Sequence, residues 1–189
     1  MQTIRSLMIF IILVLLLLFQ NNYLRAQTRV EGQSAAAPFT EYRITSDTAR
    51  FSVVFPGKPF HADSRDVSEP GIKREIIYQK DYQQTEITYY SFASILLESR
   101  RPSDVREFLR EKADNYHIKW DYEPATNNPL EYQGLNGREV ETRINDKYNM
   151  RVWLFYRDSI FYEFSIVGPP DSINGAPGNA FLKSIEFLD

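Results

Sequence analysis

The sequence predicts one α+β domain built on a mostly antiparallel sheet of about six to seven strands, with helices on both faces. Several segments alternate apolar and polar residues with the period of a strand, as residues 50–55 do. Residues 148–156 and 160–168 are apolar on both faces, which is typical of strands covered on both sides. The segment that begins at Ser103 has apolar residues at helical spacing instead.

The N-terminal segment, residues 1–26, predicts a secretory signal peptide. Arg5 supplies the positive charge, residues 7–19 form an unbroken apolar run, and the small residue Ala26 precedes the expected cleavage site. This run is shorter than the roughly 20 residues that a helix needs to cross the hydrocarbon core. Leu24 is larger than the small residue usual at its position before the cut, so an uncleaved membrane anchor stays open as the alternative.

The rest of the chain divides into a flexible leader, residues 27–38, and a single domain, residues 39–189. Removing residues 1–26 takes away Arg5 and Arg25 and no acid, which changes the net charge of −3 for the 189-residue chain to −5. This balance excludes a nucleic-acid binder that works through bulk positive charge.

The absence of cysteine excludes a disulfide framework, a thiolate zinc site, an iron–sulfur cluster, a cysteine nucleophile and a lipid-modified cysteine. An exported chain without cysteine favours a bacterial route, to the periplasm or out of the cell, because small secreted eukaryotic domains usually carry disulfides.

The expected elements follow from periodicity and turn residues. Strands are expected at residues 41–44, 50–55, 71–80, 85–95, 137–144, 148–156, 160–168 and 184–188. Two prolines within residues 56–59 end the second strand, and residues 61–66 are interpreted as a polar loop. Ser103 is the expected N-cap of the main helix, whose apolar face holds Val105, Phe108, Leu109, Ala113 and Tyr116. A shorter helix is expected at residues 176–183.

The order of these elements is familiar from a known superfamily. Residues 51–59 read Phe-Ser-Val-Val-Phe-Pro-Gly-Lys-Pro, residues 134–137 read Gly-Leu-Asn-Gly, and residues 181–187 read Phe-Leu-Lys-Ser-Ile-Glu-Phe. Over residues 41–189 the chain resembles the PsbP-like/Mog1-like α/β/α superfamily, and within it exported bacterial domains of unknown function. The resemblance implies the fold and an accessory or partner-binding role without catalysis. No motif here identifies the photosynthetic complex or the small GTPase that some members bind.

Two histidines are the candidates for chemistry. His61, with Asp63 and Asp66, could bind a metal, but one imidazole and two carboxylates make a weak ligand set, so the loop interpretation is preferred. His117 could act as a base, but a histidine in the last helical turn more often interacts with the free carbonyls there. No Gly-x-Ser-x-Gly motif accompanies it.

Three functions remain. The preferred one is an exported, non-catalytic domain that binds a protein or a cell-envelope component, with no catalytic, cofactor or metal residue assigned. The second is a carrier of a small apolar ligand, held between Trp153 and Phe155 on the sheet and Phe108 and Tyr116 on the helix. The third is a hydrolase that uses His61 or His117. Nucleic acid is not an expected partner, and the membrane is one only if the N-terminal segment is not cleaved.

Overall fold

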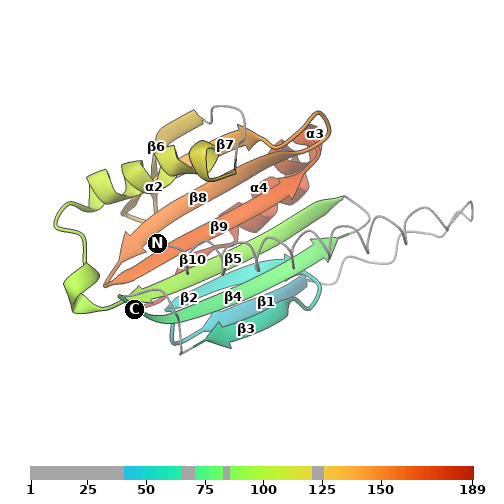
Figure 1. Cartoon of the computed structure of the whole chain (residues 1–189). Coiled ribbons are helices and arrows are strands. Elements are labelled where there is room, and N and C mark those ends of the chain that lie inside the picture. The colour runs from blue at the N-terminus through green and yellow to red at the C-terminus, as the bar shows by residue number, and fades with distance from the viewer. Residues whose placement is uncertain (1–40, 65–70, 83–85, 121–125) are drawn as a thin grey trace, which may run out of the picture. The chain divides into compact units, whose positions relative to one another are not determined.

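The computed structural model describes residues 41–64, 71–82, 86–120 and 126–189, with only the backbone at residues 117–120. These residues form ten strands in two antiparallel sheets (Figure 1). The smaller sheet has the order β1-β2-β10 and contains β1 (Glu41–Ser46), β2 (Phe51–Pro56) and β10 (Glu186–Phe187).

The larger sheet has the strand order β3-β4-β5-β9-β8-β7-β6. Its strands are β3 (Phe60–Ser64), β4 (Ile72–Tyr82), β5 (Ile87–Leu96), β6 (Thr126–Tyr132), β7 (Leu135–Arg143), β8 (Asn149–Arg157) and β9 (Ile160–Gly168). The helical elements are η1 (Glu98–Arg100), α2 (Val105–Trp120), α3 (Pro170–Asn174) and α4 (Ala176–Lys183). The prediction of a mostly antiparallel sheet of six to seven strands is therefore confirmed.

Two strands of this sheet lie where the sequence predicted none. The segment after Pro59 pairs with β4 as strand β3, so the interpretation of residues 61–66 as a loop is wrong for residues 61–64. Strand β6 contains Asn127, Asn128 and Pro129, which are residues typical of turns. It forms at the edge of the sheet, where a proline removes no hydrogen bond from a neighbouring strand.

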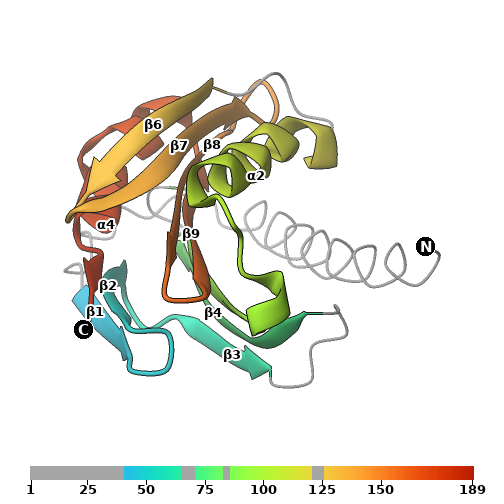
Figure 2. The same ribbon diagram turned by 90° about the vertical axis from the view of Figure 1, so that its left-hand side faces the viewer.

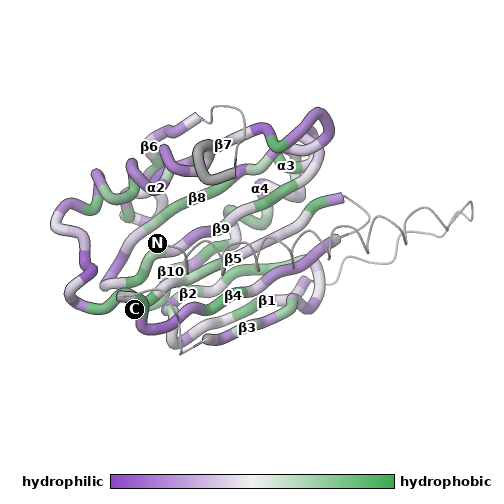
Figure 3. The backbone as a smooth tube through the Cα atoms, viewed as in Figure 1, coloured by the Kyte–Doolittle hydropathy of each residue, from purple (hydrophilic) through white to green (hydrophobic). Residues whose placement is uncertain are grey.

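The larger sheet separates two apolar cores. On one face, β2 and the segment from α3 to Ile185 pack on β4, β5, β8 and β9. On the other face, α2 packs on β7, β8 and β9. Figure 2 shows α2 and α4 on opposite sides of the sheet, and Figure 3 shows apolar residues concentrated along the central strands. The expected α/β/α sandwich is not confirmed as such, because a second sheet, and not helices alone, occupies much of the first face.

Aromatic rings make up the centre of the first core. The Phe51 ring meets those of Tyr78, Tyr162 and Phe164 edge to face, with centroid distances of 6.2, 6.2 and 5.3 Å. Phe51 lies on β2 of the smaller sheet, whereas the three partners lie on the larger one. These contacts hold the two sheets together, since edge-to-face pairs add to the free energy gained by apolar burial.

A polar network attaches the α3–α4 segment to the sheet. The Arg151 guanidinium on β8 donates hydrogen bonds to Glu139 on β7 (2.7 Å) and to the side-chain oxygen of Asn179 on α4 (2.8 Å). The Trp153 indole N–H also donates to Glu139 (2.8 Å). The Arg151 and Glu139 side chains are only 17% and 26% exposed, so this ion pair is less screened by water than a surface pair.

The C-terminal segment is held by the turn between β6 and β7. The Tyr132 hydroxyl lies 2.9 Å from the carbonyl of Lys183 and 3.0 Å from that of Ile185. The Gln133 side chain donates to Ile185 (2.7 Å) and accepts from the backbone N–H of Phe187 (3.2 Å). These bonds position the last strand, β10, beside β2.

Gly178 lets α4 approach the sheet closely. A Cβ atom at this position would lie 2.0 Å from the carbonyl oxygen of Ile173 and 2.8 Å from the Ile166 side chain. Both distances are below the closest approach that real Cβ atoms show. Only glycine therefore fits where α3, α4 and β9 meet.

We predict that Gly178→Ala destabilises the domain by about 2 kcal/mol, because the added methyl group overpacks this contact. Helix propensity alone predicts the opposite sign, a gain of up to about 1 kcal/mol. Urea unfolding followed by tryptophan fluorescence distinguishes the two. A variant as stable as the parent chain would show that the contact relaxes without cost.

The N-cap of α2 provides a second prediction. The Asp104 carboxylate accepts hydrogen bonds from the backbone N–H groups of Arg106 (2.9 Å) and Glu107 (3.1 Å), so Asp104 is the cap and the prediction of Ser103 was wrong by one residue. We expect Asp104→Ala to cost about 1 kcal/mol of unfolding free energy, the usual effect of losing such a cap. Ser103→Ala is the matched control and should leave the urea midpoint nearly unchanged. Equal losses in both variants would contradict this assignment.

Candidate functional site

Helix α2 covers only part of its face of the larger sheet. It packs mainly on β7 and β8, contacts β6, and reaches β9 through Phe108, whose ring meets that of Phe161 edge to face with centroids 5.7 Å apart. Figure 2 shows it at that end of the sheet. Within the described residues, no α-helix packs on β3, β4 and β5 as α2 packs on its strands, and the short η1 lies at the end of β5, with Arg100 close to Gly71. The side chains that these strands present there are the candidates for a functional surface.

The register of the strands shows which side chains share this face. Residues directly opposite each other in a sheet point the same way. Ile77 pairs with Phe92, Phe92 with Glu163, and Glu163 with Leu154. Leu154 packs in the core beneath α2, so the whole row lies on the face that α2 covers in part. The same pairing extends to Ala62 on β3.

We call this surface the open face. Its larger side chains are Phe60, Glu75, Ile77, Gln79, Asp81, Tyr90, Phe92 and Glu163.

Aromatic and aliphatic side chains form the middle of the open face. The rings of Tyr90 and Phe92 are parallel, with centroids 6.5 Å apart. Phe92 also packs against the edge of the α2 core. Phe60, at the outer strand, is 67% exposed, far more than Tyr42 (37%) and Leu97 (44%), the other exposed large apolar side chains among the described residues. Ile77, Tyr90 and Phe92 are half-buried, so Phe60 is the exposed apolar side chain of this face. Apolar side chains left partly exposed beside a core are characteristic of interaction surfaces.

The electrostatic environment of the open face is negative. Burial, followed by the charges of Glu163 and Glu75, raises the pKa of the Tyr90 phenol far above its usual value of 10. Burial also raises the pKa of Tyr116 on α2, as do the charge of Glu163 and the hydrogen bond that the Tyr116 hydroxyl donates to it. Both phenols stay protonated at physiological pH, so they can donate hydrogen bonds but cannot serve as bases.

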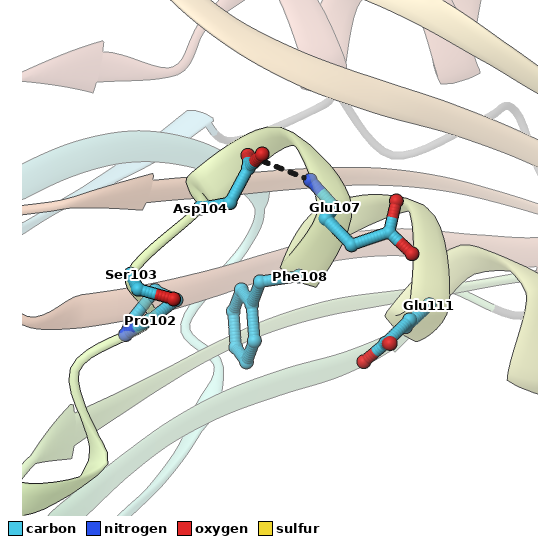
Figure 4. Close-up of a pocket in the computed structure, with 6 residues that line it drawn as sticks. All are labelled: Pro102, Ser103, Asp104, Glu107, Phe108 and Glu111. Carbon is cyan, nitrogen blue, oxygen red and sulfur yellow. Dashed lines mark hydrogen bonds between the residues drawn. The ribbon is translucent and has the colours of Figure 1, made fainter.

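A hollow at the start of α2 adjoins the same helix. It is lined by Pro102, Ser103, Asp104, Glu107, Phe108 and Glu111 (Figure 4). Asp104 caps the helix, and Arg110 donates hydrogen bonds to both oxygens of Glu107, at 2.9 and 2.5 Å. These two carboxylates therefore already have partners within the helix.

The wall proposed for an apolar ligand is not formed. Trp153 and Phe155 lie in the core of the first face, whereas Phe108 and Tyr116 pack on the other face with α2. Trp153 is 6% exposed, and its indole N–H is occupied by Glu139. The sheet separates the two pairs, because alternate residues of β8 point to opposite faces.

His61 lies on β3 with its ring stacked on Tyr78, the centroids being 4.5 Å apart. Both oxygens of Asp63 accept hydrogen bonds from Arg74, one of them at 2.6 Å. Asp66 lies outside the described residues. Within the described part of the chain, no three His, Asp or Glu side chains are grouped to hold a metal ion. His117 belongs to α2, but its side chain lies outside the description, so the hydrolase hypothesis is untested at this residue.

Sequence reasoning did not single out Tyr90, Phe92 and Glu163. Because successive residues of a strand point to opposite faces, these residues point away from the face of the larger sheet that carries the first core. It does not indicate how far a helix distant in sequence extends across that side. Their importance follows only from the position of α2.

The raised pKa of Tyr90 leads to a prediction about alkaline stability. A phenol with a raised pKa holds its proton more tightly in the folded chain than in the unfolded chain. Its contribution to the free energy of unfolding is therefore complete below pH 10 and is lost as the pH rises above 10. Tyr90→Phe should therefore make the decline in unfolding free energy between pH 10 and 12 shallower by about 1.4 kcal/mol per pH unit. Urea unfolding at several pH values measures this slope. Parallel curves for the two chains would contradict the buried, proton-bound phenol.

No helix within the described part of the chain is long and apolar enough to cross a membrane.

Comparison with known proteins identifies the fold. No protein-family model and no curated protein sequence matches the chain. Among solved structures, the chain is similar to the solution structure of cyanobacterial PsbP (CyanoP) from Synechocystis sp. PCC 6803, with a TM-score of 0.54 and 8% identity over 84% of this chain and 99% of that one. A crystal structure from Bacteroides thetaiotaomicron matches 78% of this chain and 48% of that one, at 12% identity and a TM-score of 0.34. The first similarity establishes that the chain has a PsbP-like fold.

Proposed function

We propose that this protein is an exported, non-catalytic domain that binds a protein or a cell-envelope component through the open face. The observation that carries the proposal is the incomplete cover of the larger sheet. Helix α2 buries the side chains over β7 and β8, while the apolar row that continues through Phe92 and Ile77 has no described helix above it.

Two further observations support a binding role. The perturbed groups here, Tyr90 on this face and Tyr116 on the adjoining helix α2, have pKa values raised toward the neutral phenol, which suits hydrogen bonding and not proton abstraction. The PsbP-like fold fits the accessory, partner-binding role that the sequence resemblance implies. Neither observation identifies the partner.

Export is part of the proposal. It rests on the apolar run of residues 7–19 and on Ala26, after which we expect cleavage by a signal peptidase. The processed chain would then act in a periplasm or outside the cell. If cleavage fails, the same segment would keep the domain at the membrane.

Site-specific crosslinking tests the proposal. A photoreactive phenylalanine analogue placed at Phe60, or at Gln79 directly opposite it on β4, should crosslink the same partner in the organism's own cells. The analogue at Tyr42, an exposed aromatic position on β1, is the matched control and should not crosslink that partner. Mass spectrometry identifies the adduct and the crosslinked segment. Equal capture from Phe60 and Tyr42, or no capture from the open face, would show that this surface does not bind the partner.

A further inference from the structure

Strand β3 forms one edge of the larger sheet. Among the described residues it pairs only with β4, and Figure 1 shows it as the outermost strand of this sheet. Four of its five residues are exposed, and the fifth, Ala62, is half-buried. The edge of a sheet presents a row of backbone N–H and C=O groups that can pair with a further strand.

The two edges of the larger sheet differ in their protection against such pairing. At the other edge, β6 contains Pro129, which has no N–H to donate, and its Asn127 side chain donates a hydrogen bond to Asp114 on α2 (2.6 Å). Strand β3 contains no proline, and its pairing with β4 runs through residues 60–64 without a bulge. Prolines and bulges are common devices that prevent pairing with another chain, so β3 is the edge suited to adding a strand.

The sequence of β3 is complementary to itself in one antiparallel register. When two copies of the strand are centred on Ala62, this residue lies opposite its own copy. Phe60 then lies opposite Ser64 of the second copy, and His61 lies opposite Asp63 of the second copy. The small methyl group at the centre lets the two backbones approach, and each large ring has a small side chain beside it.

The polar pair in this register joins a donor to an acceptor. The His61 ring stacks on Tyr78, with centroids 4.5 Å apart, and an imidazole has an N–H to donate in either protonation state. Asp63 accepts hydrogen bonds from Arg74, and its side chain is still 31% exposed. Each carboxylate oxygen has two lone pairs, so the same group can accept from a second donor. The pair occurs twice, once on each side of the centre.

We propose that two copies of the chain pair through β3, antiparallel and about a two-fold axis at Ala62, so that their seven-stranded sheets form one continuous sheet. The self-complementary register is the observation that favours a second copy over a strand from another protein. Residues opposite each other in antiparallel strands point to the same face, so the open faces of both copies lie on one side of the dimer. Five residues make a small interface, so the dimer should dissociate on dilution.

Single cysteines test the register directly, because the chain has no cysteine of its own. Ala62→Cys should form a covalent dimer on oxidation, since opposite residues have Cα atoms about 4.5–5.5 Å apart, within the range of a disulfide. Phe60→Cys alone should not, because its two copies would lie about 14 Å apart. An equal mixture of Phe60→Cys and Ser64→Cys chains should crosslink again. Non-reducing electrophoresis of the full chain, produced with its own leader, measures each product.

Asn128→Cys on β6 is the matched control at the protected edge of the same sheet. It should give about tenfold less covalent dimer than Ala62→Cys, because its neighbour Pro129 removes a donor from that edge.

A variant without cysteine measures the dimer itself. Ala62→Lys places two like charges opposite each other, so it should raise the dissociation constant of the dimer by about tenfold. Asn128→Lys is the matched control and should leave this constant unchanged. Mixing Ala62→Lys with Ala62→Glu chains should restore a dimer of one copy of each, because the opposite charges then face each other. Sedimentation velocity over a series of protein concentrations reports all three results.

Contrary results have definite meanings. A chain that stays monomeric at every concentration, equal covalent dimer from Ala62→Cys and Asn128→Cys, or crosslinking of Phe60→Cys to itself would overturn the proposal. A photoreactive residue at Ala62 that captures a different protein and no second copy would overturn it as well. The dimer does not depend on the proposed function, which is tested by capture of a different protein from Gln79, so either can fail while the other stands.

Discussion

The burial of β8 and β9 on both faces is the constraint on which the rest of the fold depends. Successive side chains of a strand point to opposite faces, yet Val152, Trp153, Leu154 and Phe155 are all buried. Phe161, Tyr162, Phe164, Ser165 and Ile166 are buried in the same way on the neighbouring strand. Water must therefore be excluded from both sides at once, and each side needs its own layer.

The two layers are built differently because different parts of the chain supply them. On the first face, β2 reaches the sheet through Phe51, and the C-terminal segment completes the layer through Phe181 and Leu182. In this layer Gly178 lets α4 pack closely against α3 and β9. The hydrogen bonds of Arg151 and Tyr132 attach the same segment to the larger sheet. On the second face, one helix packs mainly by apolar contact on the strands nearest to it, and Asp114 on the helix accepts a hydrogen bond from the Asn127 side chain on β6 (2.6 Å).

The candidate site follows from this asymmetry. Because α2 extends from β6 to the near side of β9, the row from Leu154 to Ile77 runs out from beneath the helix. Beyond the helix the face changes character, since carboxylates and a protonated phenol accompany the apolar side chains there. Such a mixture of aromatic and polar groups is characteristic of surfaces that bind other molecules.

Local pattern in the sequence determined the type and order of most elements: the hairpin of β4 and β5, the meander of β7, β8 and β9, and helices α2 and α4. It also determined the requirement for two covering layers, since the apolar residues of β8 and β9 can be counted on both faces. The edge strands β3 and β6 were missed because their residues favour turns, and pairing with a neighbouring strand outweighed that preference. Only the tertiary structure decided which face each aromatic residue occupies, and so separated Trp153 and Phe155 from Phe108 and Tyr116. The physical reason is that register and layer packing depend on contacts between residues distant in sequence, and these contacts alone determine where the cover of the sheet ends.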